Sequence, residues 1–479
     1  MTTTLDPTIR QADITRLRAS LDAVIAVPGD VHYDDEVSTW NSSVTLRPAV
    51  VIGARTPEDV VTAVAWAVDL GLPVGVNATG HGAVANAAGA LLINTSRLSA
   101  VSIDVATATA TVGAGARIRD VAVAAARYGW ACVQGSTSST GAVGFTLGGG
   151  LGVLSRTFGL AADHVLSIDV VTPDGRLRTV DADHTPDLFW ALRGGKGNFG
   201  VVTSYRTALI TRSTCYGGGI FFDGVDAPAV LHHYRHWITG HTDDTSSSVA
   251  LLRVPADPGL PEPIRGRFVV HVRMGHVGDP AEGARIATAM RRAAPVLLDT
   301  LGEIPLAALD MVHLDPPGPV PAHERGCLLD GLPDDAIDAI LRQTTPADSP
   351  LVLTEIRHLG GAVARPPVAP NAVPGRSSPF ALFAIAPAAP PLAEAGPRAV
   401  QTLLDAMQPW RSTTNLPNFL GRSTDPTTVA AAWPPETRAR LLDIKRAWDP
   451  DNLFRLGHAL LRTPPRTGTR SATAPPSHD

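Results

Sequence analysis

Two glycine-rich stretches place the main chain where it could contact a charged or planar ligand. Residues 148–152 read Gly-Gly-Gly-Leu-Gly. Four glycines in five residues let the backbone approach another molecule closely and expose successive N–H groups that can hold an anion. Upstream, His81 stands between Gly80 and Gly82. A neutral imidazole is a capable nucleophile, and the glycines leave room for another group to reach its ring. Tight turns and a solvated histidine are the alternatives at these two places.

Two other patterns favour structural interpretations. Residues 195–200, Gly-Lys-Gly-Asn-Phe-Gly, match GxGxxG, but a dinucleotide fold places that pattern between a strand and a helix. Here a predicted helix precedes the pattern and a predicted strand follows it, so we expect a turn. His232 and His236 are four residues apart on a predicted helix, yet no third ligand lies at a characteristic spacing. We therefore expect a solvated helix face and no metal site.

The composition is that of an ordinary globular protein. The chain has 479 residues, 44% hydrophobic and 18% charged, with a formal net charge of -5. The length predicts about two to four domains, and the charge argues against nucleic-acid binding. No apolar run reaches about 18 residues and the N-terminus is polar, so we expect no membrane helix, no signal peptide and a cytoplasmic location. Cys132, Cys215 and Cys327 are an odd, widely spaced set, which predicts reduced thiols.

The elements that position the glycine stretches follow from local signals. Thr56 caps a predicted helix that begins at Pro57 and ends at Gly71, and a short buried strand over 73–76 runs straight into the loop 77–82. Further strands are predicted over 91–94, 101–105, 108–112, 165–172, 177–180 and 201–210, and helices over 118–128 and 187–193. After about residue 211 the connections become long and Pro-rich, with strand-like runs over 268–272, 351–356 and 380–385 and a helix over 435–448.

Taken in order, several motifs resemble one protein family. They are Thr79-Gly80-His81, the glycines from 135 to 152 with Leu147-Gly148-Gly149-Gly150, residues 187–195, residues 197–203, Asn418-Phe419 and residues 449–454. This combination resembles the berberine-bridge-enzyme-like branch of the FAD-linked oxidases, which have the vanillyl-alcohol-oxidase/PCMH fold. The similarity covers about residues 30–461 and is strongest over 47–207.

The resemblance implies an α+β fold in which a PCMH-type FAD-binding domain is built from two segments around an inserted α/β substrate domain. It predicts the FAD-binding domain over 1–211 with its core at 47–211, and the substrate domain over 212–409. Residues 410–462 would return to the FAD domain. Residues 463–479 are rich in Pro, Ser, Thr and Arg and are expected to be a disordered tail.

The resemblance also implies FAD as cofactor and a set of residues that hold it. The loop 76–83 would cradle the pyrophosphate, His81 would be bonded covalently to the flavin 8α carbon, and Asn418 would lie near the flavin ring. The expected cofactor-binding residues are His81, Asn77, Ala78, Thr79, Gly80, Gly82, Ala83, Gly135, Ser136, Ser139, Thr140, Gly141, Gly144, Gly148, Gly149, Gly150, Gly152, Gly200, Val201, Val202 and Asn418.

Three positions depart from the family pattern. Many members carry a second covalent link from a cysteine at the position of Thr137, and Cys132 is out of register, so a single link through His81 is expected. Members often have arginine at the position of Asn77, so backbone N–H groups must do more of the pyrophosphate binding. A tyrosine pair common in relatives is replaced near Trp433, so the catalytic base cannot be carried over from it.

The resemblance implies oxidation of a C–H bond next to a hydroxyl or amine of a small molecule, for instance in secondary metabolism. Hydride would go to the flavin, and O2 would reoxidise it to give hydrogen peroxide. Two alternatives remain open: a dehydrogenase that passes electrons to another acceptor, and a flavoprotein cyclase without net redox. The sequence names neither the substrate nor the oligomeric state.

A base must still accept the proton of the hydroxyl or amine. On the predicted strand around residues 353–358, Glu355 and Arg357 share one face because side chains alternate along a strand. Relatives place the equivalent strand beside the flavin pocket, so Glu355 is our candidate base, with Arg357 orienting substrate or tuning charge. A structural ion pair within the sheet is the alternative for the same two residues.

Overall fold

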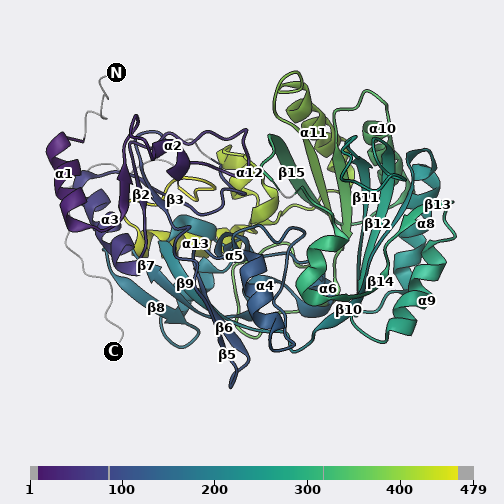
Figure 1. Cartoon of the computed structure of the whole chain (residues 1–479), viewed down its shortest axis with the longest axis horizontal. Helices are drawn as coiled ribbons and strands as arrows, with labels where there is room; N and C mark the ends of the chain where they lie inside the picture. Colours follow the sequence, from purple (N-terminus) through teal and green to yellow (C-terminus); the bar gives the residue numbers. More distant parts are fainter. Residues whose placement is uncertain (1–8, 85–86, 317, 462–479) are drawn as a thin grey trace.

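A computed structural model describes residues 9–84, 87–316 and 318–461, and the tail predicted over 463–479 lies outside this range. The molecule has a first lobe with a four-stranded and a five-stranded sheet, and a second lobe built on an eight-stranded sheet (Figure 1). Helices and strands are mixed in both lobes, as the sequence predicted.

The four-stranded sheet carries the loop that holds His81. Its strands run in the order β1-β2-β4-β3, with β4 parallel to both neighbours and β1 antiparallel to β2. Their bounds, with those of the helices around them, are β1 (Val24–Ala26), β2 (Val50–Gly53), β3 (Val74–Asn77), β4 (Leu91–Asn94), α1 (Gln11–Ser20), α2 (Tyr33–Glu36) and α3 (Pro57–Leu70). The Thr56 side chain accepts the N–H of Asp59 at 3.2 Å, and Gly71 ends the helix at φ 66°. The predicted helix and the strand after it are therefore confirmed.

The five-stranded sheet is antiparallel, in the order β5-β6-β9-β7-β8. Its elements are β5 (Val101–Asp104), β6 (Thr109–Gly113), β7 (Val165–Val171), β8 (Leu177–Asp181) and β9 (Val201–Ala208), with helices α4 (Ile118–Ala126), α5 (Ala142–Leu147), α6 (Ser155–Phe158) and α7 (Pro186–Leu192). The predicted ends agree within two residues. The GxGxxG segment 195–200 lies after α7 and before β9, which confirms the order that excluded a dinucleotide turn.

The second lobe holds one antiparallel sheet in the order β13-β10-β12-β11-β16-β17-β15, with β14 also paired to β10. Its strands are β10 (Thr214–Asp223), β11 (Thr245–Arg253), β12 (Phe268–His276), β13 (Val296–Asp299), β14 (Gly302–Pro305), β15 (Ala322–Leu329), β16 (Leu353–His358) and β17 (Phe380–Pro387). The three predicted runs fall on β12, β16 and β17. The sequence did not reveal the other strands.

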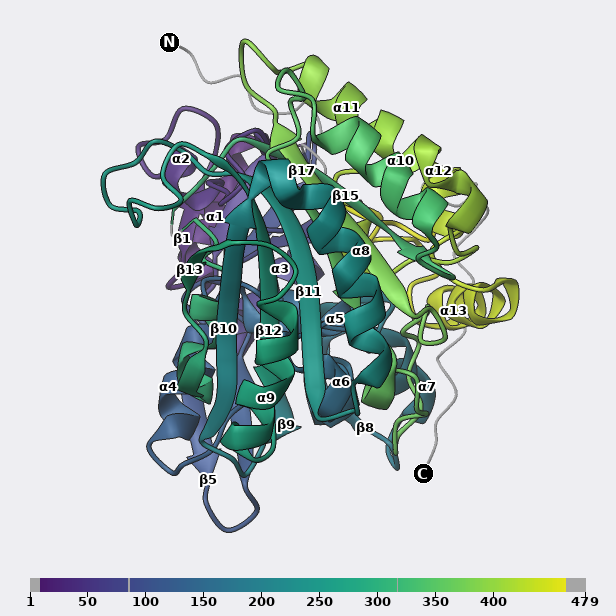
Figure 2. The ribbon, with the colours of Figure 1, turned by 90° about the vertical axis from the view of Figure 1, so that its right-hand side faces the viewer.

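Helices cover one face of this sheet, and the opposite face borders the candidate site described below. The helices α8 (Ala227–Trp237), α9 (Pro280–Met290), α10 (Asp334–Thr344) and α11 (Ala395–Ala406) pack over it (Figure 2). Val249, Ile356 and Leu382 point into the core beneath these helices. Glu355 and Arg357 alternate with Ile356, so they lie on the opposite face.

The C-terminal segment returns to the first lobe through α12 (Pro426–Ala430) and α13 (Pro435–Trp448). Leu441 and Phe454 belong to the same hydrophobic core as the first-lobe sheets. The buried Lys445 ammonium donates to the carbonyls of Asn198 at 2.7 Å and Phe454 at 2.8 Å, which ties the end of α13 to the 195–200 turn. The domain limits expected at 211, 409 and 462 are consistent with this packing and stay a prediction.

Candidate active site

His81 lies in the turn that follows β3. Position 80 of this turn can be occupied only by glycine. Gly80 has φ 73°, and a Cβ on it would come within 2.5 Å of Thr39 Cα. The imidazole of His81 stacks on the Trp40 ring, with centroids 4.2 Å apart and planes 15° apart. Its Nε2 lies 3.2 Å from the hydroxyl of Ser139. The turn therefore presents the imidazole to the loop that precedes α5.

The environment of His81 keeps its ring neutral. Burial, followed by the charge of Arg117, lowers the pKa of His81 to about 4. At neutral pH the imidazole therefore has a free lone pair, as a nucleophile requires. Beside it, the indole N–H of Trp40 is buried and has no hydrogen-bond partner among the described residues. An unpaired buried donor next to a neutral imidazole fits a ligand that brings acceptor atoms.

The 77–83 turn and the loop before α5 contact each other at more than one point. The Gly141 N–H donates to the Thr79 hydroxyl at 3.2 Å, close to the contact between His81 and Ser139. Gly141, the N-cap residue of α5, thus joins this turn to the loop before α5, and a role of Ser136, Thr140 and Gly144 in cofactor binding stays a prediction. Of that turn, Asn77 is buried and donates its amide to the Ser38 carbonyl at 3.1 Å. Ala78, Gly82 and Ala83 share the turn.

The glycine run after α5 comes into contact with other main chain and with Asn418. Gly149 and Gly150 have φ 106° and 74°, and a Cβ on Gly148 would lie 2.0 Å from Asn418 Oδ1. The Asn418 amide donates to the Phe145 carbonyl at 2.9 Å. These glycines let Asn418, Val373 and Ala161 approach where a Cβ would clash, so the run is closely packed by the protein, and its contact with the cofactor stays a prediction. Gly152, in the same run, packs closely against neighbouring backbone.

Two parts of the predicted set lie away from the contact between the loops. Gly200 directly precedes strand β9, and the first two residues of that strand, Val201 and Val202, belong to the first-lobe core. Gly135 lies against the Phe145 ring, where a Cβ would come within 3.1 Å. Gly200 in turn packs against Val170 and Val171 of β7. Their direct contact with the cofactor stays a prediction.

Glu355 and Arg357 lie on β16 in a buried ionic cluster. The Glu355 carboxylate accepts from Ser248 at 2.7 Å, Arg273 Nη1 at 2.7 Å and Arg357 Nε at 2.8 Å. Burial alone would raise the pKa of Glu355, but Arg357 and Arg273 outweigh it and hold that pKa well below its usual range. A carboxylate so stabilised is a weak proton acceptor. The geometry therefore favours the structural ion pair over the general base at this position.

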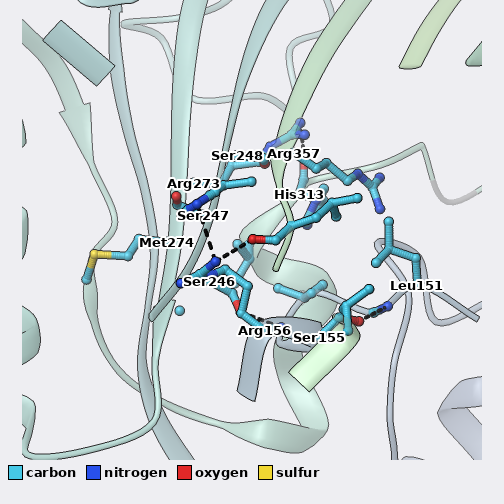
Figure 3. A pocket seen from close by; sticks show the side chains of 17 residues that line it. Leu151, Ser155, Arg156, Ser246, Ser247, Ser248, Arg273, Met274, His313 and Arg357 are labelled. Carbon is cyan, nitrogen blue, oxygen red and sulfur yellow. Dashed lines mark hydrogen bonds between the residues drawn. The ribbon is translucent and has the colours of Figure 1, made fainter. Parts of the chain in front are cut away.

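A cavity lies between this cluster and the glycine run (Figure 3). Leu151 and Gly152 form one wall, and strands β11, β12 and β16 form the opposite wall. Arg156, Arg273 and His313 also line it, and the sequence did not single them out. Ser248 lies opposite Arg273 on one neighbouring strand and opposite Arg357 on the other. This strand register cannot be read from any local pattern in the sequence.

Two further titratable side chains near Asn418 also escaped the sequence patterns. Lys196 has φ 57° in the 195–200 turn, and its Cε lies beside Gly148 and Asn418. Burial lowers the pKa of Lys196 to about 8. Glu324 on β15 lies on the site face of the sheet, and burial raises its pKa to about 7 although Lys196 acts in the opposite direction. A non-glycine residue at positive φ and a carboxyl that titrates near neutrality are both signs of a functional site.

Other features that the sequence singled out do not form a second functional site. His232 pairs with Asp334 at 3.1 Å on the outer face of α8. No group of three or more potential metal ligands occurs within residues 9–84, 87–316 and 318–461. Over the same residues, no helix combines the length and apolar character needed to cross a bilayer. All three cysteines are free thiols, and burial raises the pKa of Cys132 to about 12.

The fold and the loops define an FAD-binding protein. Residues 48–181 match the family model described as an FAD binding domain, which identifies FAD as the cofactor and confirms the resemblance drawn from the motifs. This range contains the His81 turn and the whole glycine run. The eight-stranded lobe lies outside this range.

Known proteins share this arrangement. The (R)-6-hydroxynicotine oxidase of Paenarthrobacter nicotinovorans is 31% identical over 192 residues, which cover 40% of this chain and 42% of that protein. The chain spans about two fifths of the length of the curated relatives it matches. Their activities are therefore properties of those proteins.

Solved structures match over almost the whole chain. BBE-like 1 of Physcomitrella patens has a TM-score of 0.82 at 19% identity, covering 94% of this chain and 99% of that one. Glucooligosaccharide oxidase of Acremonium strictum, whose FAD is described as 6-S-cysteinyl and 8α-N1-histidyl, has a TM-score of 0.81 at 18% identity, covering 94% and 100%. The chain thus has the PCMH-type fold of FAD oxidases, including its second lobe.

Proposed function

We propose that this chain is an FAD-dependent oxidase of small molecules. It would remove hydride from a C–H bond next to a hydroxyl or amine and use O2 as electron acceptor, yielding hydrogen peroxide. The observation that carries the proposal is the neutral, glycine-flanked imidazole of His81, which points at Ser139 across the junction of the two FAD-domain loops. Bound FAD would supply the redox chemistry, and the protein would supply orientation and proton transfer.

We infer that the cofactor is attached once, through His81. Thr137 stands at the position of the second link, and its hydroxyl lies 3.1 Å from the Ser139 hydroxyl. Cys132, the nearest thiol in sequence, is held protonated by burial and is a poor nucleophile. A single bond leaves the remaining contacts to backbone and to donors such as the Trp40 indole.

We assign proton acceptance to Glu324 in place of Glu355. A general base works best when its pKa lies near the working pH, and the pKa of Glu324 is about 7. Glu355 is ionised but fully engaged by Arg273, Arg357 and Ser248. Arg357 would orient the substrate, as the sequence suggested.

The deciding experiment measures the flavin directly. Purified protein is reduced anaerobically with a panel of alcohols and amines while the flavin absorbance is followed, and air is then admitted while peroxide is assayed. Bleaching by a substrate, followed by rapid recovery with one peroxide per turnover, supports the oxidase. Bleaching that air reverses only slowly, while a dye reverses it quickly, identifies a dehydrogenase instead. Conversion of a substrate without any bleaching would mean a reaction without net redox.

A further inference from the structure

The cavity between the glycine run and the second-lobe sheet has an unbalanced charge. Its wall contains Arg156, Arg273 and Arg357 together with His313 and His358, and no aspartate or glutamate is among the 17 lining residues (Figure 3). The chain as a whole has a net charge of -5, so this concentration of positive charge is local. Two carboxylates lie outside the lining: Glu355, which pairs with Arg273 and Arg357 and is only 1% exposed, and the half-exposed Asp243, 3.8 Å from Arg156. A cavity lined by positively charged side chains attracts a negatively charged ligand.

Two of the three arginines are engaged by the protein itself. Arg156 donates to the carbonyls of Thr245 at 2.9 Å and Thr242 at 3.3 Å, and it also contacts the Leu359 carbonyl. Arg273 donates to His271, to Glu355 and to the His313 carbonyl through its three nitrogens. Their hydrogen-bonding capacity is largely used, so they contribute charge and support to the wall.

Arg357 differs from both because only one end of its guanidinium is bound. Its Nε donates to Glu355 at 2.8 Å, and no partner occurs for its two terminal nitrogens among the described residues. The side chain is 14% exposed, and its Cζ lies 5.8 Å from the ring of Phe419, next to Asn418. Glu355 thus fixes the guanidinium while leaving a two-pronged set of donors open to the cavity. That geometry matches a planar carboxylate.

Two neutral histidines complete the wall and add no charge of their own. Burial and then Arg156 lower the pKa of His358 to about 3, and burial followed by Arg273 lowers the pKa of His313. His313 is 5% exposed, lines the cavity and has an Nδ1 atom without a partner in the described structure. A buried polar side chain that faces a cavity unpaired is expected to meet a ligand atom there.

We propose that this cavity binds a carboxylate of the substrate, with the terminal nitrogens of Arg357 as its bidentate partner. The inference rests on the proposed function, because the cavity opens beside the glycine run of the FAD domain. The substrate class is then a small hydroxy- or amino-compound that carries an acid group, with its apolar body toward Phe419, whose ring centroid lies 5.8 Å from the Arg357 guanidinium carbon.

The test uses the FAD-bound protein and calorimetric titration with benzoate, benzamide and inorganic phosphate. Benzoate and benzamide have nearly the same shape but differ in charge, so the difference isolates the carboxylate. We expect benzoate to bind and benzamide to bind at least about tenfold more weakly, as for a lost charge-assisted pair. Equal binding of the two overturns the proposal, and so does phosphate binding as tight as benzoate binding.

Variants of Arg357 test whether this residue binds the carboxylate of benzoate. R357Q should weaken benzoate binding by about tenfold or more, and R357K should lie between because it keeps the charge without the planar fork. The control is R398Q, because Arg398 is 70% exposed on the helix-covered side and pairs only with Glu394 in the described structure. Thermal melting of each variant checks folding, and R357K decides the matter if R357Q does not fold. Unchanged benzoate affinity in a folded Arg357 variant refutes the assignment.

The outcomes separate this inference from the proposed function. Flavin bleaching by alcohols or amines together with absent benzoate binding would leave the oxidase standing and refute the carboxylate subsite. Benzoate binding that depends on Arg357, with no flavin reduction by any substrate in the panel, would support the subsite and refute the oxidase.

Discussion

The imidazole of His81 and the hydroxyl of Ser139, 58 residues apart in sequence, meet at 3.2 Å. This contact joins the turn after β3 to the loop before α5, and it places the neutral imidazole of the turn at the junction. We predict that H81A protein loses its covalent flavin. After acid precipitation the yellow colour should move from the pellet to the supernatant, while the wild-type pellet stays yellow.

The matched control for this change is H184A. His184 has a side chain that is 79% exposed and pairs only with Asp181 in the described structure, so its loss should leave the pellet yellow. A yellow pellet from H81A would show that the flavin is attached elsewhere. A colourless wild-type pellet from yellow protein would show that attachment is noncovalent.

The parts of the fold that the sequence predicted are those set by neighbours along the chain. The Thr56 cap, the proline at position 57 and Gly71 determine both ends of α3 by local hydrogen bonding and backbone conformation. The helix at Pro435–Trp448 was predicted for the same reason, because Asp449-Pro450 cannot continue it. Such signals do not depend on the rest of the molecule.

The parts it did not predict depend on strand register. Ser248 lies between Arg273 and Arg357 only because β11 pairs with β12 on one side and β16 on the other. Glu324 reaches the site face through the pairing of β15 with β17, and the segment around it has no alternating pattern. Pairing between strands tens of residues apart is a tertiary property, so the charged cavity could not be derived from composition or spacing.

A glycine of the run supplies a second prediction. Gly150 has φ 74°, and a Cβ there would come within 2.5 Å of Ala161 Cβ and 2.9 Å of the Phe145 ring. G150A should cost about 1–2 kcal/mol for the left-handed backbone alone, and the loop must also shift. We expect a lower FAD content per protein chain, measured from the ratio of flavin to protein absorbance.

The control for this change is G197A in the neighbouring turn. Gly197 is exposed and has an ordinary φ of -80°, and a Cβ added to it would meet no described atom within 4 Å. This variant should bind FAD like the wild type. If G150A keeps its full FAD content, the glycine run does not contact the cofactor closely.

The ionic cluster on β16 predicts a stability effect. E355Q would leave Arg273 and Arg357 buried without their counter-charge, which costs about 3–5 kcal/mol when one partner of a buried pair is removed. Denaturant unfolding should detect this loss near neutral pH. Because the folded pKa of Glu355 lies below the unfolded value, its contribution is complete above about pH 4.5 and is lost as the pH falls below that. The difference between wild type and E355Q should therefore shrink in acid, and a constant difference would contradict the ion pair.

The last prediction distinguishes the two candidate bases by their pH dependence. A base must be deprotonated to act, so kcat/KM of the wild type should rise with pH through about 7 and level off above it. E324Q should lower kcat/KM by about 10²–10⁴ and abolish this limb. K196M should move the limb to higher pH, because Lys196 favours the ionised form of Glu324. E394Q, which changes a side chain 85% exposed on the surface, should leave the profile unchanged. A wild-type limb that survives in E324Q would assign proton acceptance to another group.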